Sequence, residues 1–139
     1  MGLVYADIEL INADDMALVR RSLMDKDEVK HMHINMLVDS GAYMMAINES
    51  IQEQLQLPFI EKRKSIMADG SIVEHSVVGP IVVKFQNRQA VCNAVVLQGS
   101  NEPLLGAIPM EELDVIIHPK RQEMIVHPDH PYFAQLSLK

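Results

Sequence analysis

A single carboxylate, Asp39, stands where an apolar run ends in a tight turn. Residues 36–38 are typical of a buried strand, because consecutive apolar residues suit a strand that is covered on both faces. Ser40, Gly41 and Ala42 follow as a turn. An ionisable group at the edge of a core has its pKa shifted by desolvation and by neighbouring charges. Asp39 is therefore the candidate general acid or base of this chain.

Strands are the elements that must position this turn. Residues 3–11 alternate apolar and polar side chains, which is the pattern of a half-buried strand. Residues 29–38 form a second, long strand that leads into Asp39. Three hairpins are expected downstream: 64–68 with 71–78 around the two-residue turn Asp69-Gly70, 81–85 with 89–97 around Asn87-Arg88, and 114–118 with 123–127 across residues 119–121.

Two short segments favour helix. Asn48 can cap a helix in which Ile51 and Leu55 share one face, and Pro58 ends it. Residues 109–113 suggest a helical turn with proline at its first position. Residues 12–28 stay open between a short strand and one or two helical turns, because periodicity cannot settle short mixed runs. The chain is expected to be mostly β, with one or two short helices.

The order of these features resembles that of retropepsin-like aspartic proteases, above all their single-domain bacterial branch. Residues 39–42 match the active-site signature of that family, the hairpin at 68–71 stands where the family has its flap, and Leu104-Leu105-Gly106 matches its second motif. The resemblance implies an all-β acid-protease fold, built as a closed β-barrel. It also implies one domain over residues 1–139, with a core of about 29–127 and a C-terminal tail of 128–139.

Only one aspartate of this type occurs, since the chain contains no second Asp-Thr-Gly or Asp-Ser-Gly. Hydrolysis of a peptide by water needs a general base and a general acid. Two neighbouring carboxyl groups fill both roles by sharing one proton. The resemblance therefore implies a homodimer in which Asp39 and its symmetry mate meet at a two-fold axis. No metal or organic cofactor is expected.

The resemblance also gives roles to the neighbours of Asp39. Gly41 is expected to let the backbone turn beneath the carboxylate, and the Ser40 hydroxyl to bond across the dimer axis. An extended peptide or protein substrate pairs with such a cleft as a strand would. The residues expected to contact it are Ala42 in the cleft and Ala68, Asp69 and Gly70 in the flap.

Two positions depart from the retroviral pattern. Many retroviral members have Asp after the Ala of the first motif and Arg after the Gly of the second, and these two residues pair near the dimer interface. Here the positions hold Tyr43 and Ala107. Both partners are absent together, which is consistent with a different interface. The glycine-rich flap tip of the retroviral members is also missing.

Other reactive side chains are assigned structural roles. Two histidine pairs invite a metal interpretation: His31 with His33, and His127 with His130. Zinc sites need three or four ligands, and the spacing brings no further ligand to either pair. Ser40 lacks the Gly-x-Ser-x-Gly context of a serine nucleophile. Cys92 lies in an apolar run and is expected to be a buried small side chain.

Composition narrows the classes of partner. Hydrophobic residues make up 48% of the 139 residues, which is typical of a globular chain, and the net charge of −7 disfavours binding to nucleic acid. The basic cluster 62–64 is expected to be a solvated strand end. One cysteine, no visible signal peptide and no apolar run of membrane-spanning length favour a cytoplasmic protein without a membrane partner.

Two functions from different classes fit these observations. The first is an aspartic endopeptidase with Asp39 as its catalytic residue. The second is a non-catalytic dimeric peptide-binding or interaction module that retains the fold, because one fold supports many functions. The intact Asp-Ser-Gly favours the enzyme. The sequence names neither a substrate nor a cleavage preference.

Overall fold

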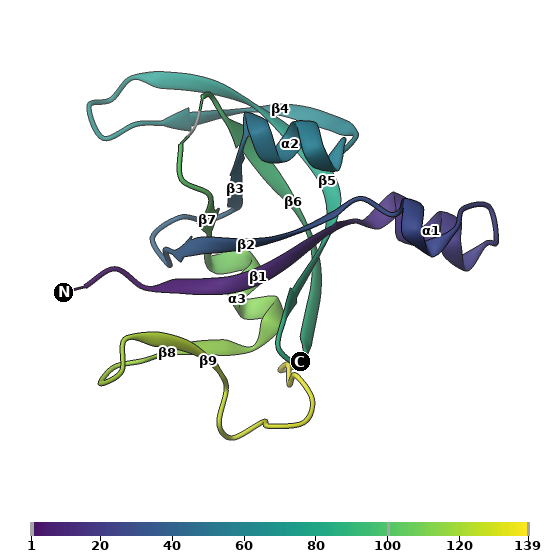
Figure 1. Ribbon diagram of the computed structural model, residues 1–139. Helices are drawn as coiled ribbons and strands as arrows, with labels where there is room; N and C mark the ends of the chain where they lie inside the picture. Colours follow the sequence, from purple (N-terminus) through teal and green to yellow (C-terminus); the bar gives the residue numbers. More distant parts are fainter. Residues whose placement is uncertain (1, 100, 139) are drawn as a thin grey trace.

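The computed structural model describes residues 2–99 and 101–138, which form nine strands and three short α-helices (Figure 1). The strands are β1 (Tyr5–Asn12), β2 (His31–Val38), β3 (Met45–Asn48), β4 (Phe59–Ile66), β5 (Ile72–Phe85), β6 (Arg88–Leu97), β7 (Leu104–Leu105), β8 (Val115–His118) and β9 (Glu123–Val126). The helices are α1 (Ala13–Arg20), α2 (Glu49–Leu55) and α3 (Ala107–Leu113), with a 3₁₀ turn at Lys26–Glu28. The mostly β prediction is confirmed, although the helices exceed the one or two expected.

Seven strands form one sheet in the order β1-β2-β7-β3-β6-β5-β4. β5 also pairs with β1, where Glu9–Asn12 lie antiparallel to Ile81–Lys84. Two pairings are parallel, β2 with β7 and β3 with β6. β8 and β9 form a separate two-stranded sheet. The β2–β7 pairing brings the strand that ends in Asp39 beside the Leu104-Leu105-Gly106 motif.

The core is filled by aliphatic side chains and methionine, with Phe85 as its one aromatic residue among those described, in keeping with a chain of only 4% aromatic residues. Along β1 the side chains of Ala6, Ile8 and Leu10 are buried, whereas those of Tyr5 and Asp7 are exposed. The predicted alternation of this strand is confirmed. Such burial contributes roughly 25 cal/mol per Å² of apolar surface, so the inner face of β1 holds the strand in place.

Residues 12–28, left open by the sequence, contain α1. The Asn12 side chain caps this helix by accepting a hydrogen bond from the Asp15 N–H at 3.1 Å. The Asp15 carboxylate in turn accepts the N–H of Lys30 at 3.0 Å. This bond joins the residue just before β2 to the first turn of α1. The start of α1 is therefore determined by these cap contacts and not by a strong amphipathic pattern.

The helix at 48–55 is confirmed as α2. The Asn48 Oδ1 accepts the Ile51 N–H at 2.9 Å, and Ile51 and Leu55 are both buried. Pro58 would allow the helix to continue to Gln56. The helix instead ends at Leu55, because Gln56 adopts a left-handed conformation with φ of 48°. Proline is the third residue of α3, not the first, since that helix begins at Ala107.

The hairpin at Asp69-Gly70 is present, but its turn differs from the prediction. The Gly70 N–H donates to the Met67 carbonyl at 2.9 Å, so Ala68 and Asp69 are the central residues of the turn. Only Gly70, with φ of 86°, has a positive φ there. This is the three-residue pattern in which a turn is followed by a left-handed glycine. The prediction of a two-residue turn at Asp69-Gly70 is wrong.

The second hairpin turns at Gln86 and Asn87, because Phe85 pairs directly with Arg88. Arg88 is therefore the first residue of β6 and is buried, not a turn residue. β5 runs on through Gly79 and Pro80, which mark a register shift rather than a break. The third hairpin, β8 with β9, forms as predicted.

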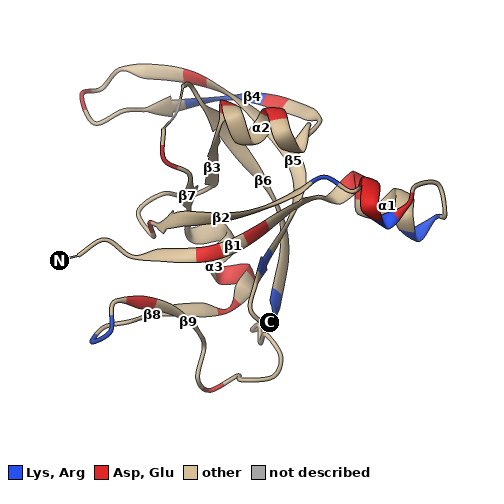
Figure 2. Ribbon diagram, in the orientation of Figure 1, with Lys and Arg blue, Asp and Glu red and all other residues tan. Residues whose placement is uncertain are grey.

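Figure 2 shows that acidic and basic residues are both distributed along the chain, over several of its elements. The basic cluster Lys62-Arg63-Lys64 lies within β4 instead of at a strand end. Two of its members form ion pairs, Lys62 with Glu74 at 3.5 Å and Arg63 with Glu61 at 3.1 Å. No helix in the part of the chain that the structure describes is long and apolar enough to cross a membrane.

Candidate functional site

The backbone around Asp39 is held by main-chain hydrogen bonds. The Asp39 N–H donates to the Leu105 carbonyl at 3.0 Å, and the Val38 N–H donates to the Val4 carbonyl at 2.8 Å. The turn is closed by the Ala42 N–H, which donates to the Asp39 carbonyl at 3.1 Å. The Asp39 carboxylate thus projects from a turn that is closed by its own hydrogen bond and bonded to two other segments, at Val4 and Leu105.

The first turn of α3 supports this loop from below. The N–H groups of Ala107 and Ile108 donate to the carbonyls of Ala42 and Tyr43, at 2.8 and 3.0 Å. These donors have no partner inside a helix, so the loop after Asp39 satisfies part of the helix N-terminus. Gly106 packs so closely that an added Cβ would clash with the Met44 carbonyl and lie 2.8 Å from the Ala42 oxygen. This contact explains the glycine of the second motif.

We expect Gly106→Ala to lower the free energy of unfolding by about 2 kcal/mol, because a methyl group forced against backbone carbonyls must displace the loop that carries Asp39. Urea denaturation measures the loss. Gly2→Ala is the matched control, since its added Cβ would meet only the flexible end of the Gln122 side chain. Equal stability of the two variants would show that the close packing at Gly106 is not required.

Gly41 lies beneath the carboxylate. Glycine is needed there for its small size and not for its conformational freedom. Its φ is not among the positive values of the described chain. Its N–H donates to Asp39 Oδ1 at 3.0 Å, and an added Cβ would lie 3.1 Å from the same oxygen. Gly41 therefore allows a close approach to the carboxylate. Ser40 is exposed beside it.

The flap hairpin lies on the same side of the molecule as the end of β2 (Figure 1). Arg63 in β4 connects the two regions, since its Nη1 lies 3.6 Å from Met44 Sδ. The predicted flap residues Ala68, Asp69 and Gly70 are all exposed at the tip. Hydrogen bonds from the Ser71 hydroxyl and N–H lower the pKa of Asp69 and fix the tip conformation.

A groove of about 880 Å³ lies between the flap hairpin, α2 and the end of β6. Its apolar lining residues are Leu57, Phe59, Met67, Val73, Val78, Val96, Leu97 and Leu104. Asp39 faces a different hollow, of about 530 Å³, beside the N-terminal segment and the β8–β9 hairpin. Leu104 in the groove pairs with Leu37 on β2, so the two spaces lie on adjoining strands. Ala42, predicted to line the cleft, lines neither of them among the described residues.

No second carboxylate accompanies Asp39 in its hollow. The other described residues that line it are Gly2, Leu3, Val4, Leu37, Val38, Ile117, Pro119 and Gln122. None of these side chains is a general acid or base at ordinary pH. The structure therefore places one carboxyl group, and not a dyad, at this position of the described chain.

Cys92 is partly buried and packs against the core, whereas the sequence predicted a buried side chain. Burial, with a smaller contribution from the charge of Glu112, raises the pKa of its thiol to about 12. The thiolate is the reactive form of cysteine, so this side chain is a poor nucleophile.

Two groups of neighbouring residues in the structure were not predicted from the sequence. Glu9 lies against His31 and His33, because β1 and β2 pair so that Glu9 stands opposite His33. Buried Arg88 reaches Asp114 and the C-terminal tail. Only the alternation of β1 hinted that Glu9 shares a face with polar neighbours. Nothing in the sequence indicated that Arg88 is buried, and the residue was predicted to lie in a turn.

The chain was compared with known proteins. No curated protein matches it. A protein-family model does match, the one described as "gag-polyprotein putative aspartyl protease", over residues 28–111. This range contains the Asp39 turn, the flap hairpin and the Leu104-Leu105-Gly106 motif, and it spans more than half of the chain. The protein therefore belongs to the retropepsin-like aspartyl protease family that this model describes.

Proposed function

We propose that the protein is an aspartic endopeptidase that acts as a homodimer, with a dyad formed by Asp39 from each of two subunits. One observation carries this proposal: main-chain hydrogen bonds hold the Asp39 turn at an accessible position, and no other described residue that lines its hollow is a carboxylate. A single carboxyl group cannot be ionised as the base and protonated as the acid at the same moment. A second copy of the chain, related by a two-fold axis, supplies the missing group.

In this dimer the two carboxyl groups share one proton, because two adjacent negative charges repel. The ionised group removes a proton from water as the water oxygen attacks the carbonyl carbon of the peptide. The protonated group gives its proton to the carbonyl oxygen. The group that took the water proton then gives it to the nitrogen as the C–N bond breaks, and the other group, now ionised, takes a proton from one hydroxyl of the tetrahedral intermediate. A carboxylic acid and an amine leave, and the two carboxyl groups again share one proton. The pair, rather than either residue, has the observable pKa values.

The groove beneath the flap supports an extended peptide or protein as the substrate. Its lining includes eight apolar residues, and the flap carries exposed apolar side chains near its tip, including Ile66 and Ile72, which are 79% and 65% exposed. Exposed apolar groups at a loop tip gain free energy when they cover an apolar ligand. Ala68, Asp69 and Gly70 are the flap residues that close over the peptide, and Ala42 contacts it near Asp39.

The proposal includes a closed β-barrel and a single domain. The β1–β5 pairing supports a closed barrel, because it joins the first strand of the large sheet to its sixth. Contacts of the tail support one domain over residues 1–139. Among them, the Asn87 side chain donates to the Pro131 carbonyl at 2.9 Å. The tail therefore packs on its own β5–β6 turn.

Cleavage of an unfolded protein pool, followed across pH with and without pepstatin, tests the proposal. We expect cleavage that pepstatin blocks and a specific activity that rises with protein concentration, because the active form is a dimer. Analytical ultracentrifugation of the same samples gives the mass. Activity from a chain of monomeric mass would contradict the shared dyad. Peptide binding without cleavage at any pH would favour the non-catalytic module instead.

A further inference from the structure

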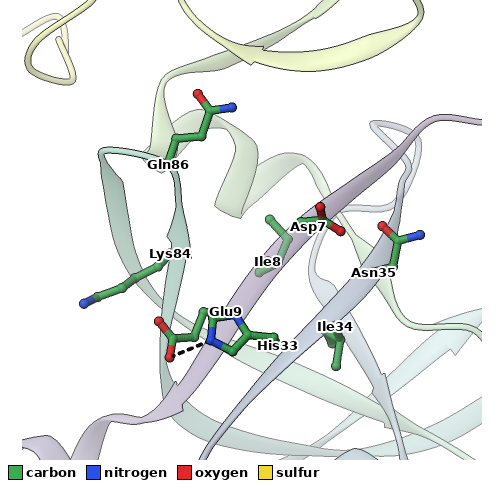
Figure 3. A pocket seen from close by; sticks show the side chains of 8 residues that line it. All are labelled: Asp7, Ile8, Glu9, His33, Ile34, Asn35, Lys84 and Gln86. Atoms are coloured by element: carbon green, nitrogen blue, oxygen red, sulfur yellow. Dashed lines mark ion pairs between the residues drawn. The ribbon is translucent and has the colours of Figure 1, made fainter.

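Three side chains on the β1–β2 ribbon converge on one point, away from Asp39. His31 and His33 lie two residues apart on β2 and so share a face. Glu9 on β1 pairs directly with His33 and lies on the same face. Figure 3 shows Glu9 and His33 pointing toward each other across the two strands, with Lys84 extending away from them.

The three side chains lie close enough together to share one cation. Both histidines approach the same carboxylate oxygen, Glu9 Oε2, with His31 Nδ1 at 3.1 Å and His33 Nε2 at 3.5 Å. One ligand atom from each of the three residues lies within 4.8 Å of the other two. Ligand atoms in a tetrahedral zinc site with bonds of 2.0–2.1 Å are separated by about 3.3 Å. A small cation can therefore replace the direct contacts without moving the strands.

We infer that Glu9, His31 and His33 bind a divalent transition-metal ion of the zinc type. Two imidazoles and one carboxylate are ligands that suit Zn²⁺, and they leave a fourth position open for water. The ion has access to the site, because the His31 and His33 side chains are 52% and 77% exposed. A hollow of about 540 Å³ lined by Glu9 and His33 adjoins it.

The bound ion would join the start of β2 to β1. Because β2 ends at Asp39, the ion would stabilise the ribbon that carries the candidate catalytic residue. A ligand that binds only the folded chain shifts the unfolding equilibrium about 100-fold at a free concentration 100 times its Kd. This inference does not depend on the proposed protease activity.

Isothermal titration of the metal-free full chain with Zn²⁺ tests the inference. We expect one ion per chain and a rise in melting temperature. His31→Ala and His33→Ala should each weaken binding at least about tenfold, because each removes one of three protein ligands. His118→Ala, in β8 and outside the cluster, is the matched control and should leave the affinity unchanged.

A second measurement locates the ion in the unaltered chain. Substoichiometric Cu²⁺ should broaden the NMR signals of Glu9, His31 and His33 before those of the other histidines, because its unpaired electron acts over short distances. The metal-free variants should keep the melting temperature of the metal-free wild type, since both histidines are largely exposed. Absence of binding, equal weakening by His118→Ala, or broadening centred elsewhere would overturn the site.

Discussion

Asp39→Asn should reduce peptide hydrolysis by at least about 10⁴-fold, because in a homodimer it removes the general acid and the general base together. The variant should still fold. Asparagine keeps an oxygen that can accept the Gly41 N–H, and the main-chain bonds of the turn do not depend on the side-chain charge. Hydrolysis of a fluorogenic peptide, selected from the cleaved protein pool, gives the rate, and thermal denaturation confirms the fold.

Asp7→Asn is the matched control, since Asp7 is an exposed carboxylate on β1. It should retain wild-type activity. Mixing tests the shared dyad directly: an equal mixture of wild type and Asp39→Asn should show about one quarter of the wild-type activity at the same total concentration, because only wild-type pairs are complete. Activity that falls linearly with the wild-type fraction would indicate one self-sufficient carboxylate per chain.

The Asp39 turn was predictable because its determinants are local. The apolar run, the Ser-Gly-Ala turn and the Asn48 cap each depend on residues within a few positions of one another, and the structure contains all of them. The resemblance to retropepsin-like proteases then supplied the long-range order, and the family match over residues 28–111 confirms it. Local patterns and order along the chain were sufficient to locate the candidate site.

Contacts between distant segments were not predictable from the sequence. β1 and β2 are joined by a long connection that contains α1, not by a short turn. The length of a turn therefore does not fix the register that sets Glu9 opposite His33. Gly106 is needed because of a carbonyl more than 60 positions earlier, at Met44. Arg88 comes directly after the turn residue Asn87, so the sequence predicted it to lie in the turn. It is buried because the C-terminal tail contacts it at His130. In each case the physical cause is a neighbour that folding alone brings close.

Arg88 has the clearest energetic consequence of these long-range contacts. Its side chain is only 1% exposed, and its Nη2 lies 3.6 Å from Asp114 Oδ2. The same carboxylate oxygen accepts His130 Nδ1 at 2.7 Å and the Gln135 N–H at 3.0 Å. Arg88 Nη2 also donates to the His130 carbonyl. Asp114 thus balances a buried positive charge and anchors the tail.

Asp114→Asn should lower the free energy of unfolding by about 4 kcal/mol, because it leaves the buried Arg88 guanidinium without a counter-charge. Asparagine keeps the shape of the side chain and tolerates the left-handed conformation of residue 114, whose φ is 55°. Urea denaturation measures the loss. Asp129→Asn makes the same substitution at an exposed position of the tail and should change stability little.

Two further measurements separate charge balance from packing. Arg88→Met added to Asp114→Asn should restore much of the stability, because it removes the unpaired charge and keeps an apolar side chain of similar size. The pH dependence follows from Asp114 itself. The Gln135 N–H, followed by the hydrogen bond and charge of His130, lowers the pKa of the Asp114 carboxyl below its ordinary value of 3.8.

A carboxyl group with a lowered folded-state pKa stabilises the chain fully above its ordinary value, and this contribution is lost as pH falls through the folded-state value. The stability difference between wild type and Asp114→Asn should therefore be constant at neutral pH and shrink below pH 3.8. A difference that stays constant into acid, or an Arg88→Met addition that lowers stability further, would mean that Asp114 acts through shape and not through its charge.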